Sequence, residues 1–86
     1  MKAIRYTNTA RNGDFSEKIV SEKDLRDGLL TSNEDARKYD SEILLDDDII
    51  RDASLEFLVD AIRKDSAAYE AKYTDMGKST IDIIEA

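Results

Sequence analysis

Residues 44–73 read LLDDDIIRDASLEFLVDAIRKDSAAYEAKY and form the longest helix-compatible run of the chain. The main helix is expected to begin at Asp46 or Asp47, because acidic residues in a first turn complement the helix dipole. At 100° per residue, one core-facing stripe collects Leu55, Leu58, Ala61, Ile62, Tyr69 and Tyr73. Asp65 falls on the same stripe, and a charged residue there predicts a break in the helix at Asp65 and Ser66.

Residues 1–20 are predicted to form a β-hairpin, because Asn12-Gly13 is typical of a two-residue type I′ turn. That turn places Arg11 opposite Asp14, Tyr6 opposite Ile19 and Ile4 opposite Ser21. One face of the hairpin would hold Ile4, Tyr6, Ala10, Phe15 and Ile19. The other would be polar and basic, with Arg5, Thr7, Thr9, Arg11, Asp14, Ser16 and Lys18.

The stretch between hairpin and main helix predicts shorter elements. Ser21 is expected to cap a helix over residues 22–30, with Asp24 at its third position. Residues 31–33 are turn formers, and residues 34–39 could add one or two helical turns. Residues 41–45 favour an irregular or helical connection.

The C-terminal part of the chain predicts a helix end and a strand. Met76-Gly77 is expected to end the main helix, with Gly77 as the left-handed C′ residue. The β-branched residues of 79–85 favour a third strand. The fold predicted for residues 1–86 is a single small α+β domain: an antiparallel hairpin, joined by a possible C-terminal strand and packed on one face by a main helix and one or two short helices.

The composition limits the chemistry. The 86 residues contain no histidine and no cysteine, which removes the usual near-neutral acid or base, the thiol nucleophile and the common zinc ligands. We therefore expect no enzyme, no cofactor and no metal. The sequence has no apolar run near the length of a membrane span, so neither a membrane partner nor any address other than the cytoplasm is expected.

Carboxylates dominate the middle of the chain, which has a net charge of −7 overall. Asp48, Asp52, Glu56 and Asp60 follow one another at i, i+4 spacing and would form a ridge about 18 Å long on a continuous helix. Like charges at that spacing destabilise a helix slightly, so the ridge suggests binding, although an ordinary solvated face is an alternative. The predicted partner-binding residues are Asp46, Asp47, Asp48, Asp52, Glu56 and Asp60.

The leading functional prediction is a non-enzymatic acidic protein-binding module. Its sharpest form is a small inhibitor whose acidic helix imitates nucleic acid and blocks a basic, nucleic-acid-binding surface of a partner protein. In composition alone, the chain is similar to many phage-encoded inhibitors of host defence and to some antitoxins. Two alternatives stay open: an antitoxin-like or regulatory homodimer whose basic hairpin face touches DNA, and a structural or assembly subunit. Direct nucleic-acid binding is expected only in the homodimer alternative.

Overall fold

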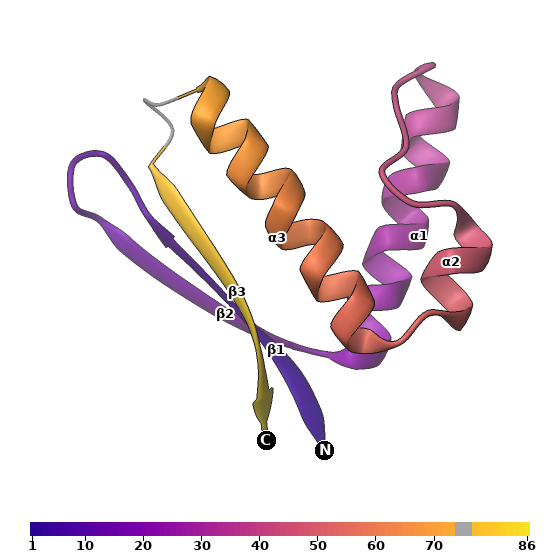
Figure 1. Cartoon of the computed structure of the whole chain (residues 1–86), viewed down its shortest axis with the longest axis horizontal. Helices are drawn as coiled ribbons and strands as arrows, with labels where there is room; N and C mark the ends of the chain where they lie inside the picture. Colours follow the sequence, from indigo (N-terminus) through magenta and orange to yellow (C-terminus); the bar gives the residue numbers. More distant parts are fainter. Residues whose placement is uncertain (74–76) are drawn as a thin grey trace.

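The computed structural model describes residues 1–73 and 77–86. Two layers make up the fold, a three-stranded antiparallel sheet and a layer of helices on one of its faces (Figure 1). The elements are β1 (Lys2–Thr9), β2 (Phe15–Ser21), α1 (Glu22–Lys38), α2 (Asp47–Asp52), α3 (Leu55–Lys72) and β3 (Lys78–Glu85). The strand order is β2-β1-β3, so the hairpin and the C-terminal strand share one sheet. The α+β architecture and the third strand are therefore confirmed.

The hairpin turn has three residues, and the predicted two-residue turn was wrong. The Ala10 N–H donates to the Asp14 carbonyl at 2.8 Å, which closes a loop of residues 11–13. Only Gly13 in this loop has a positive φ, at 93°. The Asn12 side chain accepts from the Asp14 N–H and donates to the Asp14 carboxylate, a local bond that competes with the type I′ turn.

The extra loop residue shifts the strand register by one. Tyr6 lies opposite Lys18, and Ile4 lies opposite Val20. Because side chains alternate between faces, a shift of one residue moves every side chain of β2 to the other face. Phe15 is accordingly 64% exposed instead of lying in the core.

Helix α1 is longer than predicted and runs through the expected turn at residues 31–33. Ser21 caps it as expected, accepting from the Asp24 N–H at 3.1 Å. The helix continues because the buried amide of Asn33 donates to the Leu45 carbonyl at 2.7 Å, a tertiary contact that overrides the local turn preference. It ends at Tyr39 with Asp40 in the left-handed conformation, where the Ser41 N–H donates to the Ala36 carbonyl.

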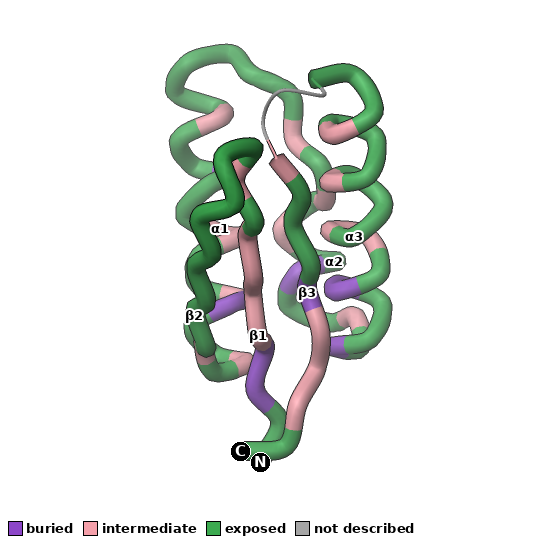
Figure 2. Tube along the Cα trace, turned by 90° about the vertical axis from the view of Figure 1, so that its left-hand side faces the viewer, coloured by how far each residue is buried: buried purple, intermediate pink, exposed green. Residues whose placement is uncertain are grey.

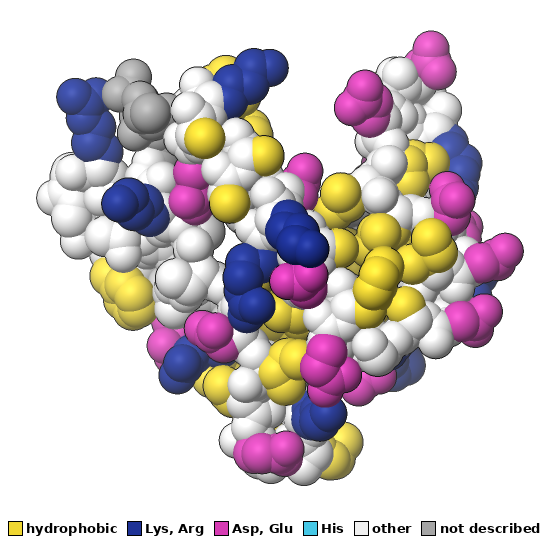
Figure 3. All heavy atoms as spheres, in the orientation of Figure 1, with side chains coloured by type: hydrophobic (Ala, Val, Ile, Leu, Met, Phe, Trp, Pro, Cys, Tyr) yellow, Lys and Arg dark blue, Asp and Glu magenta, His cyan; other side chains and the backbone are white. Residues whose placement is uncertain are grey.

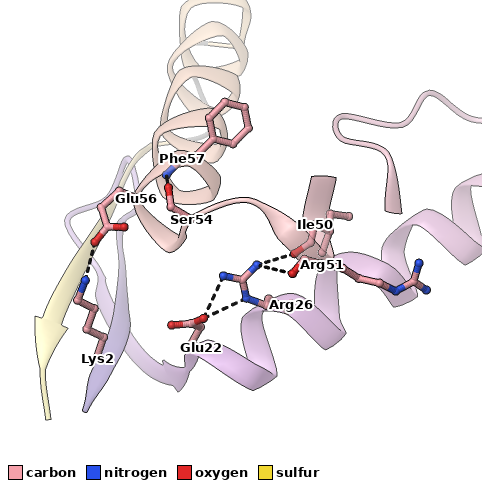
Figure 4. Close-up of polar contacts among 8 residues, drawn as sticks. All are labelled: Lys2, Glu22, Arg26, Ile50, Arg51, Ser54, Glu56 and Phe57. Atoms are coloured by element: carbon pink, nitrogen blue, oxygen red, sulfur yellow. Dashed lines mark hydrogen bonds and ion pairs between the residues drawn. The ribbon is translucent and has the colours of Figure 1, made fainter. Parts of the chain in front are cut away.

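The predicted main helix is two helices, α2 and α3. Asp46 precedes α2 as its N-cap residue, and Ala53 and Ser54 separate the two helices. The Ser54 hydroxyl accepts from the Phe57 N–H at 3.1 Å and so begins α3 anew (Figure 4). The predicted break at Asp65 was wrong, since α3 continues through this residue. The helix can continue because Asp65 lines an open hollow and is not buried in the core.

The core lies at the end of the sheet near the chain termini. Figure 2 shows the buried residues gathered in that half and mostly exposed residues toward the hairpin tip. Ile4 is the centre of the core and is fully buried. Its cluster consists of Ile4, Leu25, Leu55, Val59 and Ile81, with Tyr6, Val20, Leu29, Ile62 and Ile83 packed around it.

Arg26 ties α2 to α1. Its guanidinium donates to the Ile50 carbonyl at 2.6 Å and pairs with Glu22 at 3.0 Å (Figure 4). Gly77 has the predicted positive φ, at 83°, but the predicted helix stop was wrong, because α3 ends at Lys72 with Tyr73 as its C-cap residue. Met76 lies outside the described residues. Of the irregular and helical connections predicted for residues 41–45, the structure has the irregular one.

Candidate binding surface

A cleft opens where α1 and α3 diverge over the sheet. Four adjoining hollows of about 300 to 400 Å³ are all bounded by the Tyr6 ring. One of them lies between α3 and the segment that joins α1 to α2, and its apolar lining includes Leu29, Leu44, Leu45 and Ile62. Figure 3 shows this notch, with hydrophobic side chains along its inner wall.

Two carboxylates flank the apolar lining of the cleft. Glu42 belongs to the connecting segment and Asp65 to α3, so the charges come from both walls. Leu44, beside Glu42, is 50% exposed. Partial burial of the Tyr6 ring raises the pKa of its hydroxyl.

The acidic charge is concentrated on one wall, which we call the acidic arm: residues 34–52, comprising the end of α1, the connecting segment and α2. This arm holds eight acidic and three basic residues, a net charge of −5 out of −7 for the chain. Within the described residues, six of these carboxylates make neither an ion pair nor a side-chain hydrogen bond. They are Glu34, Asp35, Asp40, Glu42, Asp46 and Asp52. The arm therefore presents largely uncompensated negative charge.

Asp47 holds the arm together. Its carboxylate accepts from the Arg37 guanidinium at 2.7 Å and from the Asn33 amide at 2.9 Å. These two bonds lower the pKa of Asp47, with Arg37 the larger cause. The same amide of Asn33 bonds to the Leu45 carbonyl, so one network fixes the connecting segment against α1.

Acid is expected to loosen this network. Because the pKa of Asp47 is lower in the folded chain than in the unfolded chain, its contribution to stability is complete above the unfolded value and is lost as the pH falls through the folded value. The free energy of unfolding, measured with urea, should decline between about pH 5 and pH 2. This decline should be shallower in Asp47→Asn than in the wild type. Asp46→Asn, at a neighbouring carboxylate without these bonds, is the control and should retain the slope of the wild type. Equal slopes for all three proteins would contradict the assignment.

The predicted site residues fall into two groups. Asp46, Asp47, Asp48 and Asp52 lie on the acidic arm, with Asp48 3.8 Å from Arg51. Glu56 and Asp60 lie on α3 and have cationic neighbours. Lys2 lies 2.6 Å from Glu56 (Figure 4), and Lys64 lies 3.0 Å from Asp60. The Lys2 ammonium lowers the pKa of Glu56 by hydrogen bonding.

The predicted continuous ridge was therefore wrong. The i, i+4 spacing of Asp48, Asp52, Glu56 and Asp60 holds only along one helix, and the chain bends at residues 53–54. The ridge residues with the closest cationic partners are those on α3. No regular row of carboxylates spaced like phosphates results.

The cleft residues Tyr6, Glu42, Leu44 and Asp65 were not predicted as binding residues. The sequence contained one signal, since Asp65 lies on the apolar stripe of its helix. A carboxylate in such a stripe can mark the place where the stripe leaves the core and faces an open cleft. Leu44 and Glu42 had no signal, because their position depends on the Asn33 network.

The predicted basic face of the hairpin was also wrong. Lys18 lies on the helix side of the sheet beside Tyr6, whereas Arg5 shares the opposite face with Phe15, Glu17 and Ile19. We call this opposite side the open face. Phe15, Glu17 and Ile19 therefore stand on the face where Asp14, Ser16 and Lys18 were expected.

The described part of the chain contains no group of carboxylates placed to hold a metal ion, and none of its helices is long and apolar enough to cross a membrane. Comparison with known proteins finds no matching family model, no matching curated protein and no matching solved structure. The functional argument therefore rests on the cleft and the acidic arm.

Proposed function

We propose that this chain is a non-enzymatic protein-binding module that holds a basic, partly apolar segment of a partner protein in the cleft between α3 and the acidic arm. The observation that carries the proposal is the apolar cleft with carboxylates on both walls, Glu42 and Asp65. An apolar centre with a polar, solvent-accessible rim is typical of protein interfaces. The net charge of −5 on the arm would speed the approach of a basic partner.

An inhibitor is the sharper form of this proposal. A partner that uses the same basic segment to bind nucleic acid could not bind both ligands at once. Competition between this protein and a short duplex for the isolated partner separates an inhibitor from a module that only docks. Displacement of the duplex would support inhibition. A ternary complex of duplex, partner and this protein would contradict inhibition.

Capture from the native host, with identification by mass spectrometry, supplies the partner for the main test. The double variant Glu34→Lys and Glu42→Lys reverses two carboxylates of the arm that have no cationic partner among the described residues. The double variant Glu56→Lys and Asp60→Lys makes the same change in charge on α3 and is the matched control. Calorimetry should show affinity lost at least about a hundredfold in the arm variant, with a much smaller loss in the control.

Salt gives a second measurement of the same binding. Because exposed charges are screened within about 8 Å at physiological ionic strength, the affinity of the wild type should fall as salt rises. The arm variant should show a weaker dependence on salt. An arm variant that binds as tightly as the wild type would overturn the proposal, and a loss confined to the α3 variant would assign binding to Glu56 and Asp60 instead.

A further inference from the structure

The two edges of the sheet differ in how their backbone groups are covered. At the β3 edge, the Arg63 guanidinium donates to the Ile81 carbonyl at 2.6 Å, and the Glu70 carboxylate accepts from the Ser79 N–H at 2.5 Å. Both side chains come from α3, and they occupy backbone hydrogen-bonding groups of β3 that an added strand would need for pairing. Such cover is a common way to prevent unwanted strand pairing.

The edge of β2 has no comparable cover within the described residues. In an antiparallel ladder, alternate residues bond to the neighbouring strand. The bond from the Ala10 N–H to the Asp14 carbonyl sets this alternation, so the even-numbered residues of β2 bond to β1. Phe15, Glu17 and Ile19 therefore direct their N–H and C=O groups toward the free edge, and Figure 2 shows this strand exposed along most of its length.

The side chains of these three residues share the open face of the sheet. Phe15 is 64% exposed and Ile19 is 54% exposed, and the Glu17 carboxylate lies between them. The free edge therefore combines unpaired backbone groups with an apolar, acidic, apolar row of side chains. An extended strand is the structure whose backbone complements such an edge.

A second copy of this chain meets like charges in two antiparallel registers, the one with full overlap of β2 and the one that pairs Phe15 with Ile19. An antiparallel pair of β2 strands with full overlap would place Lys18 opposite Lys18 of the other copy. The register that pairs Phe15 with Ile19 of the other copy would place Glu17 opposite Glu17. Like charges directly opposite one another destabilise a strand pair, so a different chain with a cation at the central position is favoured.

We infer that the free edge of β2 binds an extended segment of a partner protein, with a basic residue opposite Glu17 and an apolar residue on either side of it, opposite Phe15 and Ile19. The segment adds a fourth strand antiparallel to β2. No residue of β2 lines the hollow between α3 and the acidic arm, so either proposal can fail without the other.

The probes are two nine-residue peptides with the core VTKTV or VTETV, each flanked by threonines. Amide hydrogen exchange followed by NMR should show that the N–H groups of Glu17 and Ile19 become protected when VTKTV is added. The N–H of Lys18 bonds to β1 and should be protected already. VTKTV should bind at least about fivefold more tightly than VTETV, and Glu17→Lys should reverse that order.

Two further variants control for folding and for charge. Ile19→Pro removes an outward N–H without removing a bond to β1, so it should abolish peptide binding with the sheet intact. Glu85→Lys makes the same charge change as Glu17→Lys on the other edge strand and should leave the preference unchanged. Three results would overturn the inference: no new protection at millimolar VTKTV, equal affinity for both peptides, or concentration-dependent protection of Glu17 and Ile19 without peptide, which would indicate pairing of two copies.

Discussion

Ile4→Ala is expected to lower the free energy of unfolding by about 2–5 kcal/mol, a large part of the stability of a chain of this size. The Ile4 side chain is 0% exposed and touches the cluster formed by both long helices and β3. Its removal loses the transfer free energy of the buried groups and leaves a cavity that the centre of the sheet cannot close. Chemical denaturation followed by circular dichroism measures the effect.

Ile19→Ala is the matched control, since it makes the same change on the partner strand of the hairpin. With the observed register, Ile19 lies on the open face and its truncation should cost no more than about 0.5 kcal/mol. With a two-residue turn, Ile19 would lie opposite Tyr6 on the core face that also holds Ile4, and the two variants would be destabilised alike. Similar losses would therefore contradict the three-residue loop.

Gly77→Ala is the second large effect, with an expected loss of about 2 kcal/mol or more. The φ of Gly77 is 83°, and an added Cβ would overlap the Thr9 carbonyl oxygen and lie 3.0 Å from the Ala10 Cα. Both are backbone atoms of the hairpin, so no side chain can move to make room. The substitution should push the start of β3 away from the end of β1.

Gly13→Ala separates the clash from the backbone conformation. Gly13 has a φ of 93° but open space around its Cα, so alanine there bears only the cost of the left-handed region, about 1–2 kcal/mol. The difference between the two unfolding free energies isolates the clash with β1. A Gly77 variant no less stable than the Gly13 variant would mean that β3 does not begin against Thr9.

Local patterns were sufficient for much of the fold. The Ser21 cap, the start of a helix at Asp47 and the β-branched third strand each depend on neighbours within a few residues, and each was predicted correctly. The hairpin was predicted as an element but not in register. Asn12 and Gly13 fit two loop lengths, and the choice depends on the hydrogen bonds between Asn12 and Asp14.

The candidate site was less predictable because it is tertiary. The length of α1 depends on the bonds that Asn33 makes to Leu45 and Asp47, twelve and fourteen residues away. The same bonds place the connecting segment, and with it Glu42 and Leu44, at the cleft. The sequence showed that carboxylates are concentrated in the middle of the chain. It did not show that the predicted binding carboxylates are divided between the acidic arm and α3.

NMR mapping of the bound partner on methyl-labelled protein is the most direct test that the cleft is the binding site. Leu44 and Leu45 report the arm side of the cleft, Ile62 reports the α3 side, and Ile84 reports the open face of the sheet. A basic partner segment should shift the methyl signals of Leu44, Leu45 and Ile62 and leave that of Ile84 unchanged. Shifts at Ile84 with unchanged signals from the cleft would contradict the proposed function.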